Sequence, residues 1–201
     1  MFPILASVLV LCAVIAWNVH RGKEQVAKEE EAFWERERAA NNTRRKPLDN
    51  LDYIIIPLSE LPMDLHIDNE KIEEYVQTIK TLSESPIVNL TGFSNTDLKL
   101  EYGAPNITLL SQYDQRYTTL VGVLQRWATA LYDLGEVDAA RTILEFAIST
   151  GSDVSGSYKL LSSIYYKDNN IDAIKQLINQ AETLNSAMKQ PILEYLKAYL
   201  Q

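Results

Sequence analysis

The feature that most constrains this chain is a self-match in its C-terminal third, with a period of about 34 residues. Residues 132–139 (YDLGEVDA) align with residues 166–173 (YKDNNIDA), and the register continues without a gap to pair Ala147 with Ala181. A fixed period of this length is typical of stacked helix-turn-helix units, each too small to bury its apolar face alone. The pattern therefore predicts an array of paired helices, an architecture that favours binding over catalysis.

The apolar positions of these helices resemble the tetratricopeptide repeat (TPR) pattern, W-x₂-L-G-x₂-Y, then A-x₃-F, then P. The first unit fills these slots with Leu124, Trp127, Ala128, Leu131, Ala140, Leu144 and Ala147. The second fills them with Tyr158, Leu161, Ser162, Tyr165, Ile174, Ile178 and Ala181. A third half-unit continues the register with Ile192, Tyr195, Leu196 and Tyr199. Two departures stand out, since Ile174 replaces a small residue and no proline closes either unit.

The resemblance implies an all-α fold in which residues 113–201 form a TPR-like α-α superhelix with a C-terminal capping helix. It also implies protein–protein interaction, because in that family the first helix of each repeat lines a concave groove. In this register the groove positions share a first helix and point away from the core of their own helix pair. They are Gln125, Thr129, Tyr132, Lys159, Ser163 and Tyr166. Amide, hydroxyl, aromatic and cationic groups together suit a peptide ligand.

The N-terminus has a different composition. Residues 1–20 contain no Asp, Glu, Lys or Arg, and a helix from Met1 to Val19 would rise about 28 Å, close to the ~30 Å of a bilayer core. Trp17 stands where an interfacial anchor belongs. A cleaved signal peptide is the alternative, but no positive charge precedes the apolar run. These residues are predicted to form a transmembrane anchor.

The flanking charges predict the topology of that anchor. Residues 21–46 hold eight Lys and Arg against six Glu, and no basic side chain precedes the apolar run. The positive-inside rule then places the C-terminal domain in the cytoplasm of a single-pass cell-membrane protein. The layout of anchor, charged helix and repeats resembles bacterial single-pass membrane-anchored repeat proteins of unassigned function. An exported or extracytoplasmic TPR-like protein of envelope assembly is the alternative.

Two further regions separate the anchor from the repeats. Residues 21–46 predict a charged juxtamembrane helix or linker, rich in Glu, Lys, Arg and Ala. Residues 47–112 predict an irregular segment plus helices packed on the repeats. A short strand-like run at 53–56 is interrupted by proline, and a helix over about 69–83 is capped by Asp68.

Composition narrows the function classes. Residues 47–201 carry 11 basic and 21 acidic side chains, a net −10 that disfavours nucleic acid as a partner. Two histidines, one cysteine and seven glycines provide no catalytic triad, metal site or phosphate loop. We expect a membrane-tethered adaptor or scaffold for a protein or peptide partner, with no cofactor, metal or small-molecule substrate. An enzyme of unrecognised type is the remaining alternative.

Overall fold

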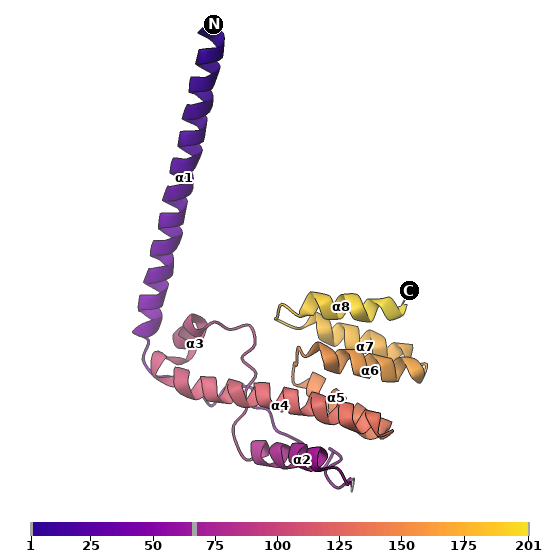
Figure 1. Cartoon of the computed structure of the whole chain (residues 1–201). Coiled ribbons are helices and arrows are strands. Elements are labelled where there is room, and N and C mark those ends of the chain that lie inside the picture. Colours follow the sequence, from indigo (N-terminus) through magenta and orange to yellow (C-terminus); the bar gives the residue numbers. More distant parts are fainter. Residues whose placement is uncertain (1, 66–67, 201) are drawn as a thin grey trace. The chain divides into compact units, whose positions relative to one another are not determined.

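The fold is helical in the part of the chain that the structure describes (Figure 1). The computed structural model describes residues 2–65 and 68–200, without the side chains of residues 2–14 and of Ala16. Within these residues no strand forms, and the predicted strand-like run contributes one antiparallel bridge, from Tyr53 to Val88. The predicted all-α class is therefore confirmed.

The chain forms two compact units. The first comprises Met1–Pro47 and Ser94–Ile107, and the second comprises Leu48–Phe93 and Thr108–Gln201. Each unit is built from segments that are distant in the sequence, because the chain leaves the first unit after Pro47 and returns to it at Ser94.

The first unit contains one long helix and two short elements. They are α1 (Phe2–Asn41), α3 (Asn95–Tyr102) and the 3₁₀ turn η1 (Ala104–Asn106). Residues 21–41 of the predicted charged helix or linker are thus the C-terminal part of a longer helix, and residues 42–46 follow its end. Ser94 caps α3.

The end of α1 packs on α3 through a small apolar contact surrounded by charges. Ala40 and Leu98 are buried. Around them Arg36 bonds the carboxylate of Asp97, which also accepts the backbone N–H of Ser94 at 3.0 Å in the α3 capping box. Because most of these groups are exposed, the pairs orient the two helices more than they stabilise them.

The predicted transmembrane anchor at residues 1–20 needs correction. Among the described residues, no helix has a stretch both long and apolar enough to cross a bilayer. Residues 1–14 and Ala16 lie outside the described side chains. The single-pass membrane localisation, with its cytoplasmic C-terminal domain, is contradicted.

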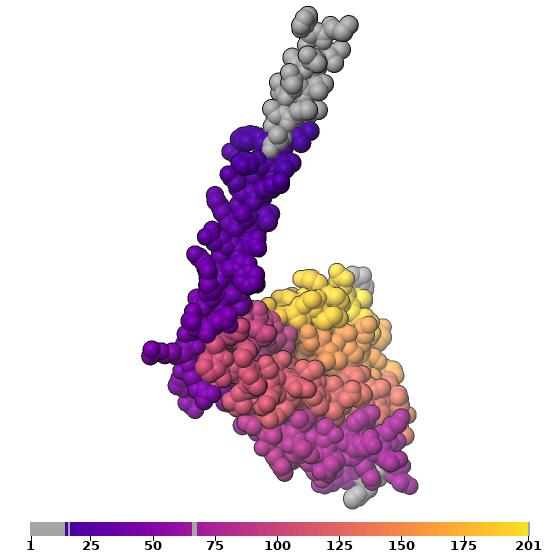
Figure 2. Space-filling view, turned by 60° about the vertical axis from the view of Figure 1, so that its left-hand side comes forward, coloured from indigo at the N-terminus to yellow at the C-terminus, as the bar shows by residue number. Residues whose placement is uncertain are grey.

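Among the described residues, the second unit contains six helices. One of them, α4, begins with a single residue that belongs to the first unit. Their bounds are α2 (Glu70–Ser83), α4 (Ile107–Asp133), α5 (Val137–Ser149), α6 (Ser155–Lys167), α7 (Ile171–Glu182) and α8 (Lys189–Lys197). A 3₁₀ turn, η2 (Ala198–Leu200), continues α8. Figure 2 shows this unit as a stack in space-filling form, from α2 in purple to α8 in yellow.

Helix ends in the second unit recur with the period of the self-match. Helices α4 and α6 end at Asp133 and Lys167, and α5 and α7 begin at Val137 and Ile171. The start of α8 follows the start of α6 by the same interval. The spacing in the sequence is therefore a spacing of helix boundaries.

The turns between paired helices have the same backbone conformation. Gly135 (φ 88°) and Asn169 (φ 57°) both occupy the left-handed region, where glycine and asparagine are tolerated best. One residue later, the N–H groups of Glu136 and Asn170 each donate at 2.9 Å to a carbonyl five residues back. This bond closes the C-terminus of α4 and of α6 in the manner of a Schellman motif.

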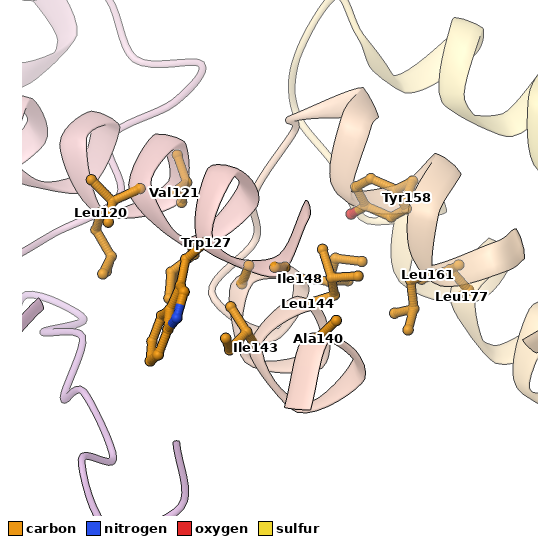
Figure 3. Packing of buried hydrophobic residues seen from close by; sticks show 14 of the residues in the cluster. Leu120, Val121, Trp127, Ala140, Ile143, Leu144, Ile148, Tyr158, Leu161 and Leu177 are labelled. Carbon is orange, nitrogen blue, oxygen red and sulfur yellow. The ribbon is translucent and has the colours of Figure 1, made fainter. Parts of the chain in front are cut away.

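The core runs through the helices without interruption (Figure 3). Helix α5 lies between α4 and α6, with Ile143 and Leu144 buried between Trp127 of α4 and Leu161 of α6. Small residues allow this close packing, because Ala140 and Ala147 on α5 are fully buried. Ala181 takes the equivalent position on α7 and is also fully buried.

Residues 48–93 pack along this core and contribute side chains to it, and do not form a separate layer. Helix α2 is capped by Asn69, whose side chain accepts from the backbone N–H of Lys71 at 3.1 Å, and not by Asp68 as expected. Ile72 and Ile79 on α2 are buried in the core shared with α4. The apolar face of α2 therefore packs as the spacing of its sequence predicts.

Asn89 anchors the loop that follows α2. Its amide donates to the Tyr117 hydroxyl at 3.0 Å and to the carbonyls of Thr150 and Gly151 at 3.1 and 3.2 Å. Tyr117 in turn donates to the Thr150 carbonyl at 3.3 Å. Burial raises the pKa of Tyr117 to about 12, so the phenol stays protonated and can donate. One side chain thus joins the loop to α4 and to the turn between α5 and α6.

The equivalent alanines provide a test of the repeat register. We expect Ala147→Leu and Ala181→Leu each to lower the free energy of unfolding by about 1–3 kcal/mol, because a larger side chain overpacks a closed helix contact. Urea denaturation measures the loss. Lys175→Leu, at an exposed position on α7, is the control. Wild-type stability in both alanine variants would contradict equivalent packing.

Two buried tyrosines allow a matched test of the Asn89 anchor. Tyr117→Phe should lower the free energy of unfolding by about 1 kcal/mol, because it removes the hydroxyl that Asn89 contacts. Tyr158→Phe should leave stability unchanged or raise it, because the buried Tyr158 hydroxyl has no hydrogen-bond partner among the described residues. Equal losses in the two variants, measured by urea unfolding, would show that the Asn89 contact contributes nothing.

Candidate functional site

The strongest candidate site is a surface formed by α4, α6 and α8, which we call the α4–α6–α8 face. It contains the six predicted groove residues and three others that the structure brings beside them. The members are Gln125, Thr129, Tyr132, Lys159, Ser163, Tyr166, Lys167, Tyr195 and Tyr199.

Gln125 and Thr129 lie at the seam between α4 and α6 and are half-buried. A Cβ at Gly156 of α6 would lie 3.1 Å from the Gln125 side-chain nitrogen, so the absence of a side chain lets Gln125 fit there. Gln125 donates to the Thr129 hydroxyl at 3.1 Å, and that hydroxyl donates to the Gln125 carbonyl at 2.9 Å. These two residues therefore bond to one another and form the floor of the face.

Tyr132 joins the end of α4 to the end of α6. The Lys167 ammonium donates to its hydroxyl and also lies 5.1 Å from the centroid of its ring. The hydrogen bond from Lys167 lowers the pKa of the Tyr132 phenol, and a further bond from Ser163 acts in the same direction. Because Tyr132 is near the surface, this contact places a cation and a phenol side by side at the rim of the face.

A second lysine lies over an aromatic ring at the other end of α6. The Lys159 ammonium is 5.3 Å from the centroid of the Tyr195 ring on α8. Tyr195 and Tyr199 contact edge to face at 5.7 Å, and their hydroxyls are 3.1 Å apart. The pKa of Tyr195 is raised to about 12, mainly by that hydrogen bond and to a smaller extent by burial.

Tyr166 is the most exposed aromatic residue of the face, with 55% of its surface accessible. Its ring lies 5.2 Å from that of Tyr199 at a tilt of 54°. Tyr166 of α6, Tyr195 of α8 and Tyr199 of η2 thus form one aromatic cluster beside Lys159. Aromatic side chains at this exposure provide apolar contact area with little loss of conformational entropy.

Sequence analysis missed three members of the face. The repeat pattern assigns Tyr195 and Tyr199 to packing slots, because they lie one period after Leu161 and Tyr165. Both are partly buried and pack against the core as those slots predict, and their rings also contact Lys159 and Tyr166 on the neighbouring face. Lys167 carries no periodic signal, and only the return of α6 alongside α4 brings it to Tyr132.

The polar and aromatic groups of the face can make several kinds of non-covalent contact. Two ammonium groups, four phenols and one serine hydroxyl point to hydrogen bonding, cation–π and apolar contact. Within the described residues, no group of three His, Cys, Asp or Glu side chains could hold a metal ion. The face thus presents hydrogen-bond donors and aromatic surface.

Comparisons with protein-family models, with curated proteins and with solved structures find no match to this chain. The TPR resemblance therefore depends on the residues and the helix geometry described above.

The contact between Lys167 and Tyr132 can be tested by titration. We expect Lys167→Ala to raise the pKa of Tyr132, because the variant removes the hydrogen bond and the positive charge that favour the phenolate. NMR of ¹³C-labelled tyrosine rings follows the titration. Lys175→Ala is the matched control, since it removes an exposed cation from α7. An unchanged Tyr132 titration in the Lys167 variant would contradict the contact.

Proposed function

We propose that the second unit is a TPR-like helical-repeat module that binds a segment of a partner protein along the α4–α6–α8 face, so that the chain acts as an adaptor or scaffold. The observation that carries the proposal is the gathering of the predicted groove residues on one surface together with an aromatic cluster. This proposal includes no membrane attachment.

The helix geometry supports the TPR-like part of the proposal. Helix boundaries, left-handed turn residues and turn hydrogen bonds all recur with the same period. Helices α4, α6 and α8 occupy the first-helix position of successive units, which is the position that faces ligand in the family this pattern resembles. Two features differ from a regular array, because α4 is 27 residues long and α8 has no second helix in the described chain.

The side chains of the face support binding over catalysis. Its titratable members are tyrosines and lysines that contact one another, and the aromatic cluster offers open surface. Catalysis by proton transfer needs a base poised near neutral pH and held close to a reacting group. A short face of three first helices also limits the buried area, so we expect modest affinity for a single segment.

Site-specific photo-crosslinking tests the proposal. A photo-reactive phenylalanine replaces Tyr166 on the face in one variant and the exposed Gln180 on α7 in the other, both in the full chain. We expect a discrete crosslinked partner from position 166 and none of the same mass from position 180, because a bound segment lies within reach of the face alone.

A second substitution identifies the contribution of the face. Adding Tyr132→Ala and Lys159→Ala to the position-166 variant should reduce the crosslinked product by at least about tenfold, if each contact contributes ~1 kcal/mol. Helicity and melting temperature serve as controls for folding. The proposal would be contradicted if the folded variant with Tyr132→Ala and Lys159→Ala gave as much crosslinked product as its parent. Equal amounts of product from positions 166 and 180 would contradict it too.

A further inference from the structure

The cations of the second unit differ in what they contact, and Arg116 on α4, which lies 5.7 Å from the centroid of the Tyr113 ring and donates to the Pro86 carbonyl at 3.0 Å, shows that a ring contact is not confined to the face. On helices away from the face, Arg141 bonds Asp168 at 2.7 Å and Lys175 bonds Asp172 at 2.9 Å. On the face, Lys159 and Lys167 lie over the rings of Tyr195 and Tyr132 instead. Among the described residues, neither of these two ammonium groups has a carboxylate within ion-pair distance. Their charges are positioned without being neutralised.

The contrast matters because the surrounding domain is strongly acidic. Residues 47–201 carry a net −10, so the two lysines without a carboxylate partner place positive charge on a chain segment that is otherwise acidic, although Asp133 also acts on Tyr132 at one end of the face. Positive charge placed in this way attracts an anionic group, whereas acidic surface around it disfavours a large polyanion. A short acidic segment of a protein fits this pattern better than a nucleic acid, whose regular phosphates would also meet the acidic surroundings.

The positions of the lysines determine the spacing of the anionic groups. Lys159 and Lys167 are eight residues apart on α6, which corresponds to about 12 Å along the helix axis. An extended peptide advances about 3.3 Å per residue, so four residues cover about 13 Å. Residues four apart in an extended chain also point to the same side. The axial rise is a lower limit for the separation of the two ammonium groups, because Lys159 leans toward Tyr195 of α8 and Lys167 toward Tyr132 of α4. Carboxylates four residues apart are thus the nearest pair on one side of an extended chain that matches the rise, and the flexible side chains of glutamate and lysine cover the rest.

The side chains between the two lysines indicate which kind of residue a ligand would carry between its two carboxylates. Tyr166 is exposed and its ring contacts that of Tyr199 at a tilt, and Ser163 is half-buried beside Tyr132. An apolar side chain midway between the two carboxylates points to the same side as they do, toward this aromatic surface. The tyrosines thus supply the contact area, and the lysines at the two ends of α6 supply the charge.

We propose that the segment recognised by the α4–α6–α8 face is an extended acidic one of the form acidic-x-apolar-x-acidic, its two carboxylates contacting Lys159 and Lys167. This inference rests on the proposed function, because it names the ligand class of the same face. Burial of the apolar residue provides most of the affinity, and the two charged contacts provide register and selectivity.

Fluorescence anisotropy with synthetic peptides tests the inference on the full chain. The probe is a labelled, terminally blocked heptapeptide with Glu at its second and sixth positions, Leu at its fourth and Ser elsewhere. Replacing either Glu by Gln should weaken binding about twofold to fivefold, as expected for an exposed ion pair. Moving the second Glu to the position beside Leu should weaken binding as much as removing it, because the shortened spacing reaches one lysine only. Added salt should weaken the acidic peptide more than the Gln peptide.

Protein variants provide the matched comparison. Lys159→Ala with Lys167→Ala should weaken the acidic peptide about fourfold to 25-fold and leave a peptide with both Glu replaced by Gln unchanged, if the two contacts are independent. Lys175→Ala with Lys197→Ala removes the same charge from paired cations elsewhere and should change neither peptide appreciably. Circular dichroism and melting temperature show that both double variants fold.

The outcomes separate this inference from the function on which it rests. Equal binding of acidic and Gln peptides, or equal losses in the two double variants, would overturn the acidic ligand while a position-166 crosslink keeps the proposed function. Tighter binding of an eight-nucleotide oligouridine than of the acidic peptide would overturn it in favour of nucleic acid. Absence of binding by every peptide, together with absence of the crosslink, would overturn both.

Discussion

The close packing of α5 between α4 and α6 is the contact on which the second unit depends. Ala140 and Ala147 keep one side of α5 small enough for the neighbouring helices to approach, while Ile143 and Leu144 fill the space between them. A helix pair of this size cannot bury its apolar face alone, so each pair is stable only when the next covers it. The same packing sets α6 alongside α4 and so places Tyr132 within reach of Lys167.

The face built on this stack differs in character from the core beneath it. Its tyrosines are partly exposed, its lysines lie over their rings, and Gln125 and Thr129 bond to each other underneath. Cation–π contacts restrain a lysine side chain without neutralising its charge, which a carboxylate partner would do. A surface organised in this way is ordered before a partner arrives, and preorganisation reduces the entropic cost of binding.

The contacts of the loop after α2 could not be predicted from the sequence. Asn89 lies in a segment that the sequence identifies only as irregular, yet its amide joins α4 to the turn between α5 and α6. Periodicity reports apolar faces, and a single buried amide has no period. The membrane prediction is wrong for a different reason. It inferred a membrane-spanning helix from the apolar composition of residues 1–20, and the described helices contain no such span.

The sequence by itself determined the helical class, the repeat period and the positions of the turns, because these depend on local periodicity and on residues such as Gly135 and Asn169 that tolerate a left-handed backbone. It also predicted six of the residues by which the face is defined, since a regular helix assigns each residue a direction. Only the tertiary structure decided that Lys167, Tyr195 and Tyr199 join them, and that Gln125 lies against Gly156. These contacts join residues on different helices, and their geometry follows from how the helices stack rather than from any pattern within one of them.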